Sequence, residues 1–82
     1  MRIVLLSRAG CAACATARAE LTRICADVGE PFEEVDVDER ATAGEKELRA
    51  EYGDRLPVVL LDGEEHSYWT VDEGRLRNDL AS

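Results

Sequence analysis

Two short apolar runs constrain the fold of this 82-residue chain more than any other feature. The first is Arg2–Leu6 (RIVLL) and the second is Pro57–Leu61 (PVVLL). A short, uninterrupted run of this kind is typical of a strand that is buried on both faces of a sheet. A chain of this length has room for a single domain, so we assign residues 1–82 to one unit.

Helical and strand patterns alternate between the two runs. From Cys11 to about Val28 the apolar residues recur at helical spacing, with charged residues on the opposite side. Phe32–Val37 then alternates apolar and acidic residues, which predicts a strand with one solvated face. Glu45–Tyr52 predicts a short polar helix that ends at a glycine. The apolar positions of the long helix are Cys14, Ala17, Leu21, Ile24, Cys25 and Val28.

The C-terminal third carries a hairpin signal and a helix start. Asp62-Gly63 predicts a tight turn from Pro57–Leu61 into a strand over Glu64–Tyr68. Thr70 and Glu73 have the spacing of a capping box, which would open a last helix that continues to Leu80. The predicted order is β-α-β-α-β-β-α, an α/β domain with a four-stranded mixed sheet and three helices. Its first strands are parallel and its last two form a hairpin.

The overall charge and the cysteine count exclude several classes of protein. A net charge of -8 disfavours nucleic acid and anionic membranes, because both repel an acidic surface. No segment approaches the ~20 apolar residues of a membrane span, and Met1–Ser7 is too short for a signal sequence. Three cysteines do not suggest a secreted disulfide scaffold. We therefore expect a cytoplasmic protein, in which a close cysteine pair indicates chemistry or metal binding.

Cys11 and Cys14 lie where the first strand gives way to the long helix. Cys11 is expected at or next to the N-cap, where free N–H groups and the helix dipole favour a thiolate and lower its pKa below ~8.5. Cys14 lies one turn further along the same face and deeper against the sheet. Cys11 is therefore the predicted nucleophile, and Cys14 the thiol that attacks a mixed disulfide on Cys11.

The chain resembles the thioredoxin superfamily and, within it, the small glutaredoxin-like proteins. The resemblance rests on Cys11-Ala12-Ala13-Cys14 after a first strand, on Leu56-Pro57-Val58-Val59 at the matching later strand, and on the order of elements. It implies a thioredoxin fold with Cys11 and Cys14 as the catalytic pair. It also implies that Pro57 is cis and faces the cysteines, and that the backbone of Leu56 pairs with the disulfide substrate.

Some residues depart from the pattern of glutathione-using relatives. Ala12-Ala13 has neither the proline nor the aromatic residue that many relatives carry between the cysteines, which leaves the redox potential open. Leu56 replaces the usual Thr-Val pair, and the later Gly-Gly turn and Cys-Asp-Asp segment are absent. Arg8 has two interpretations: it attracts an anionic thiol such as glutathione and lowers the Cys11 pKa further, or it is a solvated turn residue.

A metal site is the main chemical alternative. A Cys₃His zinc site could in principle be formed by Cys11, Cys14, Cys25 and His66. Along a continuous helix, however, Cys25 would lie roughly 16 Å from Cys14 at ~1.5 Å per residue, too far for both to bind one zinc ion. We expect Cys25 in the core and His66 on the surface, and no bound metal. An iron-sulfur cluster shared by Cys11 of two subunits is an option for glutaredoxin-like proteins, but nothing in the sequence favours it.

The favoured hypothesis is a thiol-disulfide oxidoreductase without a resident cofactor. It would act as a monomer on a disulfide-containing protein or a small-molecule thiol, and glutathione or a reductase would reset it. The contrasting hypothesis is a thioredoxin-like binding module with little turnover. Tyr68 and Trp69, where the last strand meets the last helix, either form part of a partner surface or seal the edge of the core.

Overall fold

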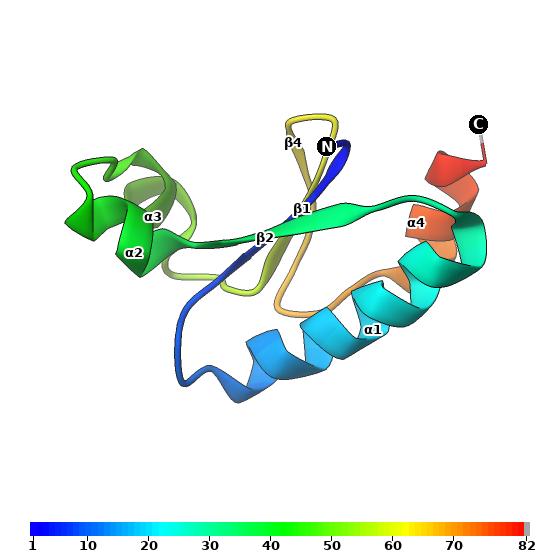
Figure 1. Ribbon diagram of the computed structural model, residues 1–82, viewed down its shortest axis with the longest axis horizontal. Coiled ribbons are helices and arrows are strands. Elements are labelled where there is room, and N and C mark those ends of the chain that lie inside the picture. Colours follow the sequence, from blue (N-terminus) through cyan, green and yellow to red (C-terminus); the bar gives the residue numbers. More distant parts are fainter. Residues whose placement is uncertain (82) are drawn as a thin grey trace.

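The sheet has the strand order β2-β1-β3-β4 in a computed structural model that describes residues 1–81 (Figure 1). β1 pairs in parallel with β2 and antiparallel with β3, and β3 pairs antiparallel with β4. This confirms the predicted four-stranded mixed sheet with a C-terminal hairpin. The strands are β1 (Ile3–Ser7), β2 (Phe32–Asp36), β3 (Val58–Leu61) and β4 (Glu64–Tyr68).

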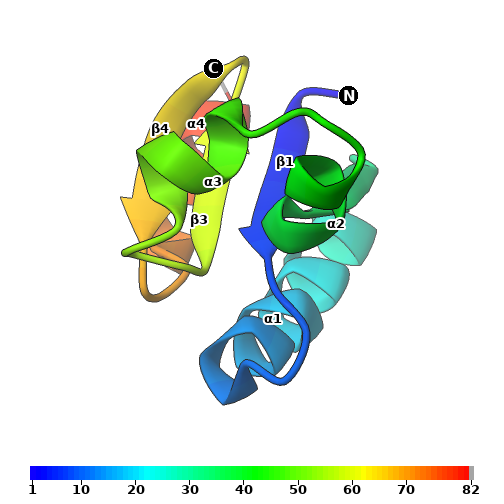
Figure 2. The ribbon, with the colours of Figure 1, turned by 90° about the vertical axis from the view of Figure 1, so that its left-hand side faces the viewer.

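Helices cover both faces of this sheet. The long α1 and the C-terminal α4 pack on one face, whereas α2 and α3 gather on the other side (Figures 1 and 2). The helices are α1 (Ala12–Val28), α2 (Val37–Thr42), α3 (Glu47–Tyr52) and α4 (Glu73–Leu80). The sequence predicted three helices, whereas the described residues contain a fourth, α2.

The apolar runs are continuous because neighbouring residues pack into two hydrophobic clusters, one on each face of the sheet. Leu5 and Val59 point to the α1 and α4 side, while Leu6 and Val58 point to the α2 and α3 side. All of them are 0–1% exposed. Since successive side chains of a strand alternate between faces, burial on both sides requires every residue of the run to be apolar.

α2 begins where the sequence predicted the end of a strand. The side chain of Asp36 accepts hydrogen bonds from the N–H groups of Asp38 and Glu39, at 2.8 and 3.1 Å, and so caps a new helix. Val37 is buried as expected, but in the first turn of α2 and not in β2. The polar cap at Asp36 therefore overrides the alternating pattern around it. α3 also starts slightly later than predicted, at Glu47.

The remaining local predictions have mixed outcomes. Asp62 and Gly63 form the predicted hairpin turn, with φ of 52° and 85°. The Thr70 capping box was wrong, because the side chain of Asp72 caps α4 by accepting from the N–H of Arg75. Val28, in the last turn of α1, is exposed and lies outside the core.

The two outer strands of the sheet are rich in carboxylates. β2 carries Glu33 and Glu34, and β4 carries Glu64 and Glu65. Within residues 1–81, every helix is too short or too polar to cross a membrane.

Candidate active site

The redox pair lies at the junction that the sequence predicted. β1 ends at Ser7, and the turn that follows contains Gly10 with a φ of 75°, a conformation that glycine adopts without strain. Cys11 is the N-cap of α1, and its Sγ accepts a hydrogen bond from the N–H of Cys14 at 3.1 Å. No acidic residue lies in the first turn of α1, so the positive end of the helix dipole faces Cys11 without a nearby carboxylate on the same turn.

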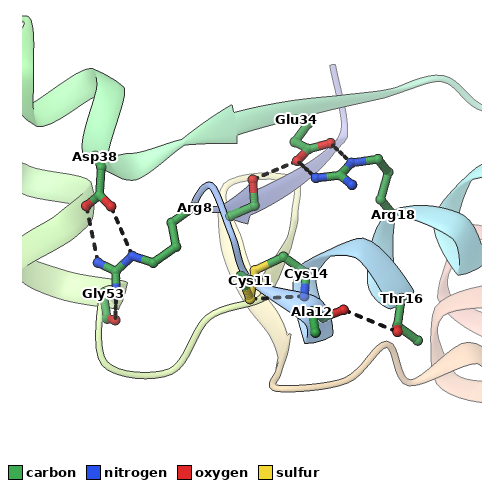
Figure 3. The surroundings of a disulfide bond; sticks show 10 residues. Arg8, Cys11, Ala12, Cys14, Thr16, Arg18, Glu34, Asp38 and Gly53 are labelled. Atoms are coloured by element: carbon green, nitrogen blue, oxygen red, sulfur yellow. Dashed lines mark hydrogen bonds and ion pairs between the residues drawn. A yellow bond between two sulfur atoms is a disulfide. The ribbon is translucent and has the colours of Figure 1, made fainter.

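Cys11 and Cys14 differ in access to solvent. Their sulfur atoms are within disulfide-bonding distance and their Cα atoms are 5.2 Å apart (Figure 3). Cys11 is half-buried, whereas Cys14 is 0% exposed. A partner molecule can therefore approach only the first sulfur directly, an asymmetry that suits a nucleophile and a resolving thiol.

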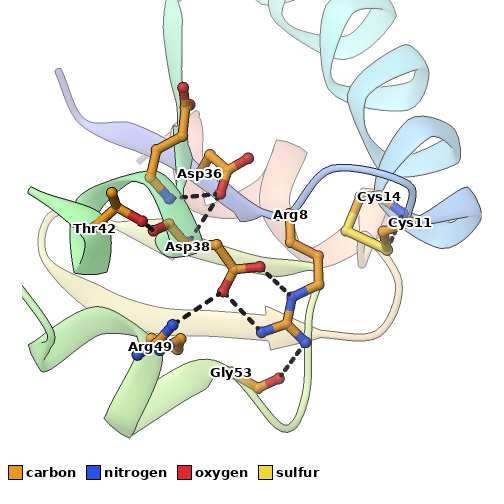
Figure 4. A network of polar contacts seen from close by, with 9 residues as sticks. Arg8, Cys11, Cys14, Asp36, Asp38, Thr42, Arg49 and Gly53 are labelled. Carbon is orange, nitrogen blue, oxygen red and sulfur yellow. Dashed lines mark hydrogen bonds and ion pairs between the residues drawn. A yellow bond between two sulfur atoms is a disulfide. The ribbon is translucent and has the colours of Figure 1, made fainter.

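The side chain of Arg8 is held by residues of α2 and of the C-terminal cap of α3, on the face of the sheet opposite to α1 (Figure 4). Its guanidinium donates to both carboxylate oxygens of Asp38 in α2, at 3.0 and 3.2 Å, and to the carbonyl of Gly53 at 3.5 Å. The Asp38 carboxylate is also 3.9 Å from Arg49. Arg8 thus ties the β1–α1 turn to α2 and α3, and a carboxylate balances its charge.

A second polar group anchors the other side of the turn. Ser7 is 2% exposed and its hydroxyl donates to Glu34 of β2 at 2.7 Å, while Arg18 of α1 holds the same carboxylate with two 2.6 Å hydrogen bonds (Figure 3). The hydrogen bond from Arg18, supported by the one from Ser7, lowers the pKa of Glu34. No sequence pattern indicated this group beyond the alternation that placed Glu34 on a strand.

Pro57 lies at the same end of the sheet as the redox pair. The register pairs Leu6 with Val58, so Pro57, which precedes β3, lies beside the end of β1 that leads into the turn before Cys11. The Leu56–Pro57 peptide bond is cis, as expected, and its proline is buried. The Pro57 carbonyl accepts the backbone N–H of Trp69 at 2.7 Å, and the Leu56 side chain packs on the α2 and α3 side.

The two other candidate ligands do not join the pair. Cys25 is 5% exposed in the α1 core, and burial, with a contribution from Glu30, raises the pKa of its thiol. His66 was wrongly expected on the surface: its side chain is 6% exposed and its Nε2 lies 2.8 Å from a carboxylate oxygen of Asp79. Over residues 1–81 we find no group of three or more His, Cys, Asp or Glu side chains arranged to hold a metal ion.

Solved structures with the same fold include a glutaredoxin and a thioredoxin-like protein. The holo form of glutaredoxin C1 from Populus tremula x tremuloides is 26% identical, with a TM-score of 0.64 over 98% of this chain and 72% of that chain. A mutant of the thioredoxin-like protein BC3987 is 21% identical, with a TM-score of 0.65 over 96% of both chains, and supports the fold alone.

Sequence comparison extends the likeness to the whole chain. An uncharacterized protein of Mycobacterium tuberculosis (strain H37Rv) is 54% identical over 80 residues, which cover 98% of this chain and 82% of that protein. Residues 2–81 match the family described as Glutaredoxin-like domain (DUF836). With the strand-turn-helix position of Cys11 and Cys14 and the thioredoxin-like topology, this match shows that the chain belongs to the glutaredoxin-like domain family.

Proposed function

We propose that this protein is a thiol-disulfide oxidoreductase in which Cys11 is the nucleophile and Cys14 the resolving thiol. The observation that carries the proposal is the position of Cys11, an accessible sulfur at the N-cap of α1 within bonding distance of a buried second sulfur. Thiolates at helix N-termini have lowered pKa values and react faster near neutral pH. In the reduced protein we expect the Cys11 pKa below the ordinary value of ~8.5.

The reaction consists of two thiol exchanges. The Cys11 thiolate attacks one sulfur of a substrate disulfide, a bond forms between Cys11 and that sulfur, and the other substrate sulfur leaves as a thiolate that takes up a proton. Cys14 then loses its proton and attacks the Cys11 sulfur, which forms the Cys11–Cys14 disulfide and releases the second substrate thiol. The substrate gains two electrons, which the protein loses, and an external thiol reductant restores the reduced pair.

The surrounding residues support this chemistry by position. Ser7 and Arg8 fasten the two sides of the turn that presents Cys11, through Glu34 and Asp38 respectively. Leu56 and Pro57 lie at the same end of the sheet, where we propose that the backbone near Pro57 aligns the substrate disulfide. No resident cofactor is needed, because the electrons come from glutathione or from a protein reductase.

The test measures disulfide reduction by variants in which one cysteine at a time is replaced. Dithiothreitol is the thiol that restores the reduced pair in the rate assay. Cys11→Ser should reduce the rate to the background of the reductant alone. Cys14→Ser, mixed with the substrate disulfide in the absence of dithiothreitol, should accumulate a mixed disulfide between Cys11 and the substrate, visible by mass spectrometry as the added mass of one substrate half. Cys25→Ala is the matched control, since this thiol is buried in the core, and its rate should equal that of the unaltered protein.

Reduction of the substrate by Cys11→Ser at the unaltered rate would refute the assignment. A Cys11 pKa no lower than that of free cysteine, together with background rates in the unaltered protein, would instead identify a thioredoxin-like binding module. Stoichiometric iron or zinc in freshly purified protein would point to metal carriage.

A further inference from the structure

A shallow groove adjoins the redox pair between α1 and the segment that follows β4. Its volume of about 170 Å³ is smaller than the roughly 300–1,000 Å³ of most small-molecule pockets. It resembles in size a cavity of ~150 Å³ that holds one benzene molecule. The groove thus has room for one apolar side chain. Its lining residues, which we call the Trp69 groove, are Ala13, Thr16, Ala17, Glu20, Trp69, Thr70 and Val71.

The groove runs along the first half of α1, the helix that Cys11 caps. Ala13 stands between Cys11 and Cys14, and Ala17 follows Cys14 by one turn on the same helix. On the other wall, the N–H of Trp69 is bonded to the carbonyl of Pro57. A polypeptide joined to Cys11 through a disulfide therefore has the groove within reach of the residues next to its own cysteine.

The aromatic wall of the groove is exposed and fixed in place. Trp69 is 60% exposed and has a φ of 68°, a left-handed conformation that is unfavourable for a bulky residue. Its ring packs edge-on against Tyr68 with 5.0 Å between centroids. Strained residues that persist are concentrated at binding and catalytic sites, and exposed tryptophan is typical of the residues that dominate interfaces. Of the two interpretations of these aromatics, sealing the edge of the core does not hold for Trp69.

The charge of the groove favours a cation. Among the described residues, the lining carboxylate of Glu20 has no hydrogen bond or ion pair and interacts electrostatically with Arg23, which is itself bonded to Glu73, whereas nearby Asp72 and Glu73 are paired with arginines. The net charge of -8 adds a negative potential over the whole surface. Because Asp38 balances the charge of Arg8, the turn before Cys11 offers little attraction to an anion such as glutathione.

We propose that the Trp69 groove selects polypeptide disulfides in which a large apolar residue neighbours the cysteine and a basic residue lies close to it. The inference rests on the proposed function and specifies its substrate class. The groove contributes binding only: the apolar side chain lies against Trp69 and Ala13, the basic group lies near Glu20, and the thiol exchange at Cys11 is unchanged. Glutathione disulfide, which is anionic and lacks a large apolar side chain, is disfavoured.

The experiment follows oxidation of the reduced protein by symmetric peptide disulfides, which requires no added reductant. Two peptides differ only in leucine or serine beside the cysteine, and two others differ only in lysine or glutamate at the next position. Reactions are stopped with acid, and mass spectrometry counts oxidised protein to give second-order rate constants. Bis(hydroxyethyl) disulfide, small and uncharged, measures the reactivity of the pair itself.

We expect the leucine peptide to react about tenfold faster than the serine peptide, the usual discrimination of a small apolar pocket. Trp69→Asn removes the indole but keeps a residue that tolerates the left-handed conformation, and Ala13→Leu fills the groove from α1. Both should bring the ratio of the two rate constants close to one. Ala19→Leu adds the same side chain to the exposed side of α1, outside the groove, and should leave the ratio unchanged.

The lysine peptide should react about three- to tenfold faster than the glutamate peptide at low salt, and the difference should shrink as salt is added. Glu20→Gln should reduce this preference, whereas Glu64→Gln, which removes an exposed carboxylate at the hairpin end of β4, should not.

Equal rate constants for the leucine and serine peptides, or a preference that survives in both Trp69→Asn and Ala13→Leu, would overturn the inference while leaving the proposed function intact. Failure to react with bis(hydroxyethyl) disulfide would overturn the proposed function, and the inference with it.

Discussion

Cys11 and Cys25 stand at the two ends of α1 in opposite surroundings. At the first end the sulfur is accessible, the neighbouring side chains are small, and the helix dipole points its positive end at the thiol. At the other end Cys25 packs among Leu21, Ile24 and Leu76, and burial raises its pKa. The comparison teaches that one helix can serve the proposed chemistry at its open N-terminal end and stability at its buried C-terminal end.

The far end of α1 is also fixed by charge. Arg23 of α1 donates to Glu73 of α4 at 2.8 Å, and Arg77 of α4 bonds both Glu73 and Asp27 of α1 at 2.9 and 2.8 Å. The hydrogen bonds from Arg23 and then Arg77 lower the pKa of Glu73 to about 2. This network joins α4 to the C-terminal half of α1, so the two ends of α1 can be altered separately.

The largest expected difference is in thiol reactivity. When the reduced protein is treated with iodoacetamide at neutral pH, Cys11 should be alkylated at least about a thousandfold faster than Cys25, because a core thiol reacts only in the rare open or unfolded molecules, a fraction of about 10⁻³ or less. Peptide mapping by mass spectrometry measures both rates in one sample. In denaturant the alkylation rates of Cys11 and Cys25 should converge. Comparable rates in the folded protein would contradict the difference in accessibility between the two thiols.

A core substitution tests the far end. Leu21→Ala removes a fully buried side chain from the α1 core and should lower the free energy of unfolding by about 2–5 kcal/mol. Urea denaturation followed by circular dichroism measures the change. The Cys11 pKa should not move in the folded protein, and a shift in it would show that the two ends of α1 are coupled.

A charge at the first turn tests the near end. Ala12→Asp places a carboxylate beside the Cys11 sulfur and should raise the Cys11 pKa, while the same charge stabilises the helix by about 0.3–1 kcal/mol. Ultraviolet absorbance of the thiolate against pH gives the pKa. Ala19→Asp, in the exposed middle of α1, is the control, and an equal shift in both variants would argue against a helix-terminus effect.

The smallest effect is expected from the charge network. Glu73→Gln should lower the melting temperature by less than Leu21→Ala does, because the ion pairs are exposed to solvent. The Glu73 pKa lies below its usual value, so its contribution is complete above about pH 4.5 and disappears as the pH falls through its folded pKa of about 2. The melting curves of Glu73→Gln and of the unaltered protein should therefore differ at neutral pH and coincide near pH 2. A difference that persists there would rule out this assignment.

The sequence predicted those elements whose signals are local. The buried strands follow from uninterrupted apolar runs, and the hairpin follows from Asp62-Gly63, whose backbone takes the positive φ values that this pair tolerates. The position of Cys11 followed from the change from strand to helical pattern. Each of these inferences needed only neighbouring residues.

Other features depend on partners distant in sequence or on competing local signals. Arg8 was assigned to a substrate or to solvent, but its observed partner, Asp38, belongs to a helix that the sequence pattern concealed. That helix could have been found from Asp36 followed by Asp38 and Glu39, a typical N-terminal pattern. Nothing in the pattern around Trp69 indicates its left-handed backbone, and the burial of His66 depends on Asp79 of α4.

The carboxylates on the outer strands have a consequence for crowded solutions. An exposed strand edge is a template onto which another chain can add, and strands that pair lie about 4.8 Å apart. Two copies meeting edge to edge would bring the exposed carboxylates of Glu33, or those of Glu64, against their equivalents, whereas Glu34 and Glu65 are each paired with an arginine. This repulsion disfavours pairing at the sheet edges while the Trp69 ring and the Cys11 sulfur remain accessible.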